Sequence, residues 1–162
     1  MQNEVQIRPL VETECDLVHE MICELADFEK LRHNVEATAD SVRDALFGAH
    51  PTAEAVLAEC NGEAVGFALF FHNYSTFVGK KGLYLEDLYV REPHRRRGIG
   101  RALLIHLAGI ARERNCGRFE WSVLDWNENA INFYQQLGAE VLPDWRTVRL
   151  DAAGIQNLAK VD

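Results

Sequence analysis

The sequence predicts a single α/β domain over residues 1–162, with a mixed, mostly antiparallel sheet and helices on both faces. Two observations carry this prediction. Asn61-Gly62 joins two apolar runs, and this dipeptide is the strongest short signal for a β-hairpin. Further along, an apolar strand, an amphipathic helix and another strand follow one another, which is typical of a crossover between parallel strands.

The N-terminal third is expected to hold one strand and two helices. Residues 5–8 have the pattern of a short strand, and apolar residues at helical spacing predict a helix over residues 12–31. Thr38 is expected to cap a second helix, which ends at Gly48.

The strand pattern LYLEDLYV begins directly after Gly82. Alternation of side chains along a strand predicts one face made of Leu83, Leu85, Asp87 and Tyr89. The adjacent carboxylates Glu86 and Asp87 are therefore expected to point to opposite sides of the sheet.

The remaining elements are a long helix, a strand, a shorter helix that ends at Gly138, and two short final strands. In chain order we expect them at residues 98–115, 118–124 and 127–137, around Val141, and at residues 147–150.

Charge and hydropathy argue against two classes of partner. The net charge of −8 is unlike that of a nucleic-acid-binding protein. No apolar run approaches the roughly 18 residues that cross a membrane, and the N-terminal segment lacks a signal-peptide pattern. We therefore expect a cytoplasmic protein with no nucleic-acid and no membrane partner.

Metal and disulfide chemistry are not indicated by the spacing of the ligand-type residues. The four cysteines and six histidines are scattered, without CxxC or HxxxH pairs. Reduced thiols and no metal site are expected.

The charges are unevenly distributed along the chain. Residues 1–90 contain sixteen acidic and six basic residues, a balance of −10, whereas residues 91–162 contain nine and eleven, a balance of +2. Five of these arginines fall between Arg91 and Arg101. This arrangement suits one cationic and one anionic partner, although a solvated acidic surface would give the same balance.

The sharpest chemical signal is the heptapeptide RRRGIGR, from Arg95 to Arg101, which precedes the long helix. Glycines let a ligand approach the backbone, and the first N–H groups of a helix point outward with the positive end of its dipole behind them. With the flanking arginines, this pattern predicts an anion site. The Gly-Lys-Ser/Thr of a Walker loop and the third glycine of the dinucleotide fingerprint are both missing.

This loop and its surroundings resemble the GNAT superfamily of acyl-CoA-dependent N-acetyltransferases. Arg95, Gly98 and Gly100 match the family's pyrophosphate loop, Arg/Gln-x-x-Gly-x-Gly/Ala, and YLEDLYV and WNENAINFYQQLGA match its other two motifs in order and spacing. The segments YSTFVGK, YLEDLYV and VLDWN are most similar to the diamine branch, the spermidine/spermine and thialysine acetyltransferases. The resemblance runs from about Val5 to Leu150.

The resemblance implies acetyl-CoA as the cosubstrate. The strand before the loop would pair with pantetheine, and the N–H of Leu88 would stabilise the oxyanion of the tetrahedral intermediate. The residues implied to bind acetyl-CoA are Leu88, Tyr89, Val90, Arg95, Arg96, Arg97, Gly98, Ile99, Gly100, Arg101, Asn127, Asn129 and Phe133. Ordinary sheet core is the alternative for the strand positions.

Two side chains are implied to move protons. Tyr134 matches the tyrosine beside the coenzyme sulfur, where a phenol can protonate the departing thiolate. Glu86 matches a strand glutamate that faces the amine. A lysine-like amine reacts only after it loses its proton, which costs about 4–5 kcal/mol at pH 7, so a carboxylate that accepts this proton is useful. A core tyrosine and a surface carboxylate are the alternatives.

The resemblance also implies where the acceptor amine binds. The branch more often has tyrosine at the position of Phe28, and Arg96 and Arg97 replace smaller residues common in its loop. Asp87 is a weaker candidate than Glu86, and a core role for Trp121 is an even alternative. The implied acceptor-binding residues are Phe28, Glu29, Glu86, Asp87, Trp121 and Ser122.

We therefore expect direct acetyl transfer to a small cationic amine, such as a polyamine or lysine analogue, in a ternary complex. The resemblance implies a homodimer whose interface includes the last strands. Two alternatives stay open. One is an enzyme that acetylates a protein N-terminus or an antibiotic amine. The other is a non-catalytic acyl-CoA-binding sensor, which would need neither Tyr134 nor Glu86.

Overall fold

The structure, a computed structural model of the chain, describes residues 5–160. The chain divides between Ser122 and Val123 into two compact units. The first unit contains a five-stranded sheet in the order β1-β2-β3-β4-β5. Its first three pairings are antiparallel and the β4–β5 pairing is parallel. The strands are β1 (Val5–Pro9), β2 (Glu54–Cys60), β3 (Glu63–Ser75), β4 (Lys80–Val90) and β5 (Phe119–Trp121).

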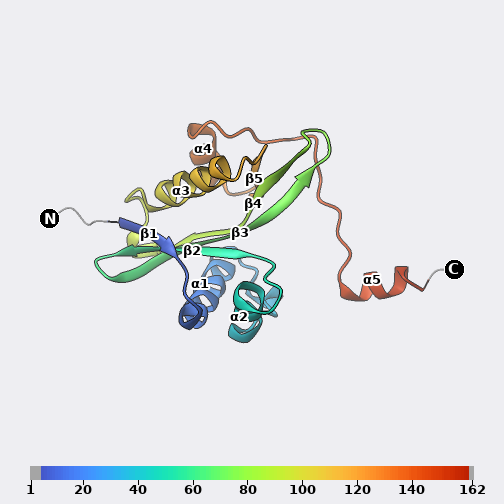
Figure 1. Cartoon of the computed structure of the whole chain (residues 1–162), viewed down its shortest axis with the longest axis horizontal. Coiled ribbons are helices and arrows are strands. Elements are labelled where there is room, and N and C mark those ends of the chain that lie inside the picture. The colour runs from blue at the N-terminus through green and yellow to red at the C-terminus, as the bar shows by residue number, and fades with distance from the viewer. Residues whose placement is uncertain (1–4, 161–162) are drawn as a thin grey trace. The chain divides into compact units, whose positions relative to one another are not determined.

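Three helices cover the two faces of this sheet. Helices α1 (Cys15–Phe28) and α2 (Ala39–Phe47) lie on one face, and α3 (Ile99–Glu113) lies on the other (Figure 1). Single 3₁₀ turns precede each of them, at Glu12–Glu14, Arg32–Asn34 and Glu92–His94. The predicted α/β class, with a mixed and mostly antiparallel sheet between helices, is confirmed.

Local signals in the sequence account for several boundaries of these elements. The Thr38 hydroxyl accepts a hydrogen bond from the Ser41 N–H at 3.2 Å, as the predicted cap requires. Asn61 and Gly62 have φ angles of 53° and 81°. Two successive left-handed residues are what a type I′ hairpin turn needs, so the predicted hairpin between β2 and β3 is confirmed.

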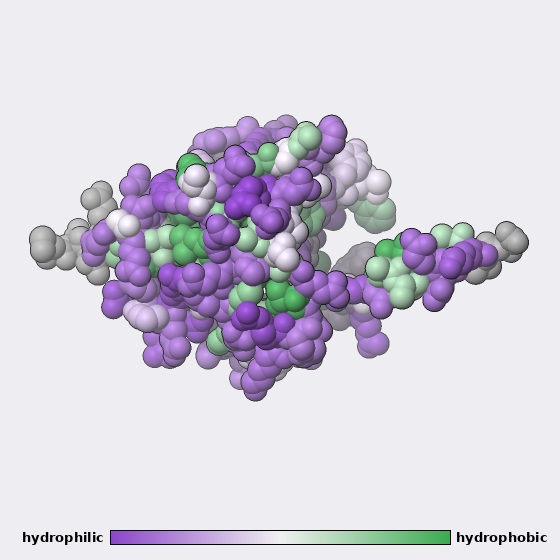
Figure 2. Space-filling model, turned by 90° about the horizontal axis from the view of Figure 1, so that it is seen from below, coloured by the Kyte–Doolittle hydropathy of each residue, from purple (hydrophilic) through white to green (hydrophobic). Residues whose placement is uncertain are grey.

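The hydrophobic core lies on both sides of the sheet. Between the sheet and the first two helices, buried residues of α1 and α2 pack against strand residues such as Phe67 and Tyr89. On the other face, Leu103 and Leu107 of α3 are fully buried. The exposed surface on the side of α1 and α2 is mostly hydrophilic, with small separate apolar patches (Figure 2).

The second unit differs from the prediction. Helix α4 (Glu128–Gln136) is present, but no strand forms in the described residues around Val141 or at 147–150, and α5 (Ala152–Leu158) follows instead. A strand needs a neighbour to satisfy its backbone, and none pairs with this segment, in which Trp145 is 79% and Val148 94% exposed. The predicted last two strands are wrong for this structure, and β5 is shorter than the predicted 118–124.

Across residues 5–160, none of the helices is both long and apolar enough to span a membrane.

Candidate active site

A β-bulge in β4 determines which side chains of this strand point to the candidate site. Leu85 pairs with Phe70 of β3 and Asp87 pairs with Leu69, so Glu86 stands as an extra residue between two adjacent pairs. Residues paired across strands share a face, so Asp87 and Leu85 point to opposite sides of the sheet. The predicted common face of Leu83, Leu85, Asp87 and Tyr89 is therefore wrong, because regular alternation stops at the bulge.

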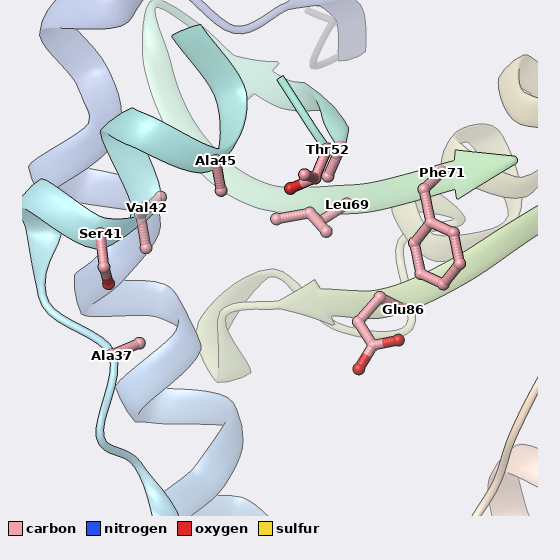
Figure 3. A pocket seen from close by; sticks show the side chains of 9 residues that line it. Ala37, Ser41, Val42, Ala45, Thr52, Leu69, Phe71 and Glu86 are labelled. Atoms are coloured by element: carbon pink, nitrogen blue, oxygen red, sulfur yellow. The ribbon is translucent and has the colours of Figure 1, made fainter. Parts of the chain in front are cut away.

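The bulge brings both carboxylates of β4 to the face covered by α1 and α2. Asp87 lies beside Leu69, which packs into the core of that face. Glu86 lines a pocket of about 470 Å³ together with Leu69 and Phe71 of β3 and with Val42 and other small residues of the α2 region (Figure 3). The expectation that Glu86 and Asp87 face opposite sides is also wrong.

Glu29 adds a third carboxylate to this cluster. It is the C-cap residue of α1, and burial raises its pKa above the usual range. The pKa of Asp87 is raised to about 6, mainly by burial and then by the negative charges of Glu86 and Glu29. The shifts at Glu29 and Asp87 indicate that these two carboxylates are partly desolvated, and the exposed Glu86 adds its charge beside them. Such a cluster favours a cation or a bound proton. From the sequence Asp87 is the weaker candidate of the two strand carboxylates, because its burial becomes visible only in the folded chain.

The edge of β4 that faces β5 is paired along only part of its length. The β4–β5 ladder contains three pairs and ends where Leu85 meets Trp121. From Glu86 to Val90, β4 pairs in the described ladders only with β3. Leu88 lies opposite Ala68 within this stretch. An extended ligand could therefore pair with the backbone of Leu88, Tyr89 and Val90 as an added strand would.

The predicted anion loop leads into α3 and has the geometry that such a site needs. Gly98 is the N-cap residue with φ 79°, and no side chain caps this helix. The first intrahelical bond to Gly98 comes from Ala102. A Cβ atom on Gly100 would meet nothing within 4 Å. The space beside Gly100 is therefore open, and an anion that enters it can approach the first turn of α3, whose N–H groups lack intrahelical partners.

The five arginines near this loop fall into two groups. Arg91 is committed to α1, because its Nη2 donates to Glu20 at 2.6 Å and to Glu24 at 3.0 Å. Arg95 donates from Nε to the carbonyl of Val90 at 2.8 Å. These two side chains contribute to packing within the first unit.

Arg96, Arg97 and Arg101 form the second group, and all three are exposed. Within residues 5–160, none of the ion pairs involves them. Arg96 also has φ 62°, a left-handed conformation that costs a residue with a side chain about 1–2 kcal/mol. These three side chains provide the positive charge around the loop.

Trp121 is the last residue of β5, and Ser122 directly follows it. The hydroxyls of Ser122 and Tyr84 are 3.0 Å apart, and the Tyr84 ring lies 5.2 Å from that of Phe71, which lines the pocket. Ser122 is thus on the face of the carboxylate cluster. Trp121 pairs with Leu85 and therefore lies on the α3 face, away from the cluster.

The second unit carries the other predicted residues on α4. The side chain of Asn127 accepts a hydrogen bond from the Ala130 N–H at 3.3 Å and so caps this helix. The rings of Phe133 and Tyr134 lie 5.4 Å apart and are half-buried, whereas Asn129 is exposed. The structure thus places these four residues on or next to one short helix.

The sheet is mixed and has a partly unpaired inner strand, and a glycine-opened helix follows that strand. The acetyltransferase (GNAT) family matches residues 18–139, so the chain belongs to this family and is an N-acetyltransferase.

Several proteins of known name are similar to this chain. The chain is 33% identical to an L-ornithine N5-acetyltransferase of Arabidopsis thaliana, over 97% of this chain and 89% of the relative. It is 36% identical to a thialysine N-epsilon-acetyltransferase of Mus musculus, over 95% and 96% of the two chains. The corresponding protein of Caenorhabditis elegans is 40% identical over 86% and 87%.

Solved structures give the same fold. An integron cassette protein from V. cholerae superimposes with a TM-score of 0.79 and 28% identity, covering 97% of this chain and 98% of the other. An aminoglycoside acetyltransferase from a soil metagenome has a TM-score of 0.74 with 20% identity, over 91% and 99%.

Proposed function

We propose that this enzyme transfers the acetyl group of acetyl-CoA to a primary amine of a small acceptor that carries a second positive charge. The observation that carries the proposal is the placement of Glu29, Glu86 and Asp87 on one face of the sheet. A dication is the ligand that such a cluster favours. The named relatives support this class, because ornithine and thialysine both carry two amino groups.

Acetyl-CoA would bind at the C-terminal end of β4 and at the loop that follows it. The open space over Gly100 and the first N–H groups of α3 would receive the pyrophosphate, with Arg97 and Arg101 adding charge. Pantetheine would extend along the unpaired edge of β4, and the N–H of Leu88 is assigned to the oxyanion.

The carboxylates would prepare the amine for attack. Glu86 lines the pocket and holds the ammonium group, while Asp87, whose pKa is raised to about 6, is the better proton acceptor near neutral pH. We therefore propose that Asp87 shares the deprotonation role assigned to Glu86 from the sequence. The pair acts directly or through one water molecule.

The reaction is proposed to be direct attack in a ternary complex. The amine nitrogen forms a bond to the acetyl carbon, and the carbon–sulfur bond of the thioester breaks. The amine proton passes to the carboxylate pair, and Tyr134 gives its phenolic proton to the departing thiolate. This assignment for Tyr134 rests on its place in the NENAINFY motif.

We also propose that the enzyme acts as a cytoplasmic homodimer. The family resemblance motivates this, and the exposed apolar side chains of Trp145 and Val148 support it. Light scattering of the purified protein should give twice the chain mass of 18.4 kDa. A concentration-independent monomer would contradict the dimer.

The acceptor class is tested by comparing a diamine with a monoamine of equal length and similar reactive-amine pKa. We expect kcat/KM to be about tenfold higher for the diamine, because the second ammonium meets the remaining carboxylates. The advantage should shrink with salt, since the Debye length falls from about 10 Å at 0.1 M to about 3 Å at 1 M. Equal values without salt dependence would exclude the diamine class, and acetyl-CoA binding without turnover of any amine would favour a sensor.

A further inference from the structure

Arg95 is the first residue of the anion loop, and its side chain contacts the end of α1. Its guanidinium carbon is 4.7 Å from the centre of the Phe28 ring and 5.5 Å from the centre of the Tyr89 ring. Its Nε donates to the carbonyl of Val90 at 2.8 Å. A guanidinium held over two ring faces and one carbonyl has a defined orientation, because each contact restricts a different part of the group.

Through Phe28, Arg95 is connected to the carboxylates proposed to bind the acceptor amine. Phe28 is the last residue of α1, and Glu29 is its C-cap residue. Glu29 in turn acts on the charge of Asp87. Because Phe28 and Glu29 are consecutive at the end of α1, a shift of the backbone at Phe28 also moves Glu29.

Arg95 is not needed simply to hold α1 in place. Arg91 already ties the middle of this helix to the end of β4 through Glu20 and Glu24. Nor is Arg95 the main source of charge at the loop, because Arg96, Arg97 and Arg101 are exposed there. What distinguishes Arg95 is its contact with the last turn of α1.

We propose that Arg95 is a positioning residue for the acceptor amine: it joins the anion loop to Phe28 and so sets the place of Glu29. This inference rests on the proposed function, because it takes Glu29 as part of the amine site. Its consequence is that loss of the Arg95 cation acts mainly on the acceptor and only weakly on acetyl-CoA, although Arg95 lies within the loop.

The experiment compares Arg95→Gln with Arg97→Gln by steady-state kinetics, using a diamine that the wild-type enzyme acetylates. Glutamine at position 95 keeps an N–H donor for the Val90 carbonyl but removes the cation over the rings. We expect Arg95→Gln to raise the acceptor KM about tenfold, with kcat and the acetyl-CoA KM within threefold of wild type. Arg97→Gln should show the reverse, with the larger change in the acetyl-CoA KM.

A double-mutant cycle with Phe28→Leu separates positioning from general loss of structure. If Arg95 acts through the ring, Arg95→Gln should change the acceptor KM by less than twofold in the Phe28→Leu background. Additive effects, or an Arg95→Gln effect confined to acetyl-CoA, would overturn the proposal. Should Arg95→Gln not fold, Arg95→Met, which also removes the cation but keeps an unbranched side chain, and Phe28→Leu form the same cycle. Failure of the proposed function shows separately, as no acetylation of any amine by the wild-type enzyme.

Discussion

The carboxylate cluster and the anion loop both concentrate charge, but in opposite ways. Glu29 and Asp87 are partly desolvated, and both have raised pKa values. Arg96, Arg97 and Arg101 are exposed and surround backbone N–H groups that do not titrate. The charge of the cluster therefore depends on pH, whereas the attraction of the loop for an anion depends mainly on ionic strength. The two substrates of the reaction can thus be controlled by different properties of the solvent.

The largest expected effect tests the pH-sensitive half of this comparison. Asp87→Asn should lower kcat/KM at pH 7 by about 10²–10³-fold, because general bases typically contribute this much. Wild-type kcat/KM should rise with pH as Asp87 loses its proton near pH 6. Steady-state rates of both proteins between pH 5 and 8 measure these changes.

The same variant should be more stable than the wild type at neutral pH. The pKa of Asp87 is about 6 in the folded protein, above the usual aspartate value of 3.8. The unfolded chain therefore loses this proton first, and stability falls as pH rises from about 4 to 6. An asparagine does not ionise, so the stability of Asp87→Asn does not fall in this pH range. At pH 7 its free energy of unfolding should be roughly 1–3 kcal/mol higher than that of the wild type. Glu36→Gln, at an exposed position, is the matched control. An Asp87→Asn protein with wild-type stability and rate would remove the desolvated-cluster argument.

Tyr134→Phe should leave both charged regions intact and still lower kcat by about 100-fold. The substitution removes one hydroxyl from a half-buried ring, so α4 should still fold. The KM values for both substrates should stay within threefold of wild type. Full kcat with a substrate for which chemistry limits the rate would show that Tyr134 only packs.

Gly100→Glu should act on the loop alone and weaken acetyl-CoA binding at least tenfold, or about 1.4 kcal/mol. The new side chain would fill the open space over the first turn of α3 and add a negative charge there. Gly109→Glu is the matched control, because a Cβ there also meets nothing within 4 Å and it lies further along the same helix. Calorimetry that finds equal acetyl-CoA affinity in the two variants would contradict the loop assignment.

The smallest effect concerns the strain at Arg96. Arg96→Gly should weaken acetyl-CoA binding about threefold through the loss of one exposed charge. It should also raise the free energy of unfolding by up to about 1 kcal/mol, because relief at φ 62° outweighs the added flexibility of the unfolded chain. Asn115→Gly, at another left-handed position, should leave the affinity unchanged. Loss of stability in Arg96→Gly would show that the arginine is not strained.

Local signals in the sequence predicted most of the first unit because each acts over a few residues. The Thr38 cap, the Asn61-Gly62 turn and the glycine before α3 need only their neighbours to form. The face of Asp87 could not be predicted in this way. It depends on how β4 aligns with β3, and alignment between strands is decided by tertiary pairing.

The same reasoning explains the other differences. The contact of Arg95 with Phe28 joins residues 67 positions apart, so no spacing rule indicates it. The strands expected near Val141 and at 147–150 have suitable residues but lack a partner strand in the described chain. Strand propensity alone does not form a strand when its backbone has nothing to bond.

The bulge also implies a simple way in which this pair of carboxylates could arise. If Glu86 is left out, the remaining residues of β4 alternate without a break, with Leu85 and Leu88 on the α3 face and Asp87 and Tyr89 on the other. Glu86 is therefore equivalent to a one-codon insertion in a regular strand. Such an insertion adds a second carboxylate beside Asp87 while every core side chain keeps its side of the sheet. An ancestral or designed sheet could thus gain or lose this pair by a single in-frame insertion or deletion.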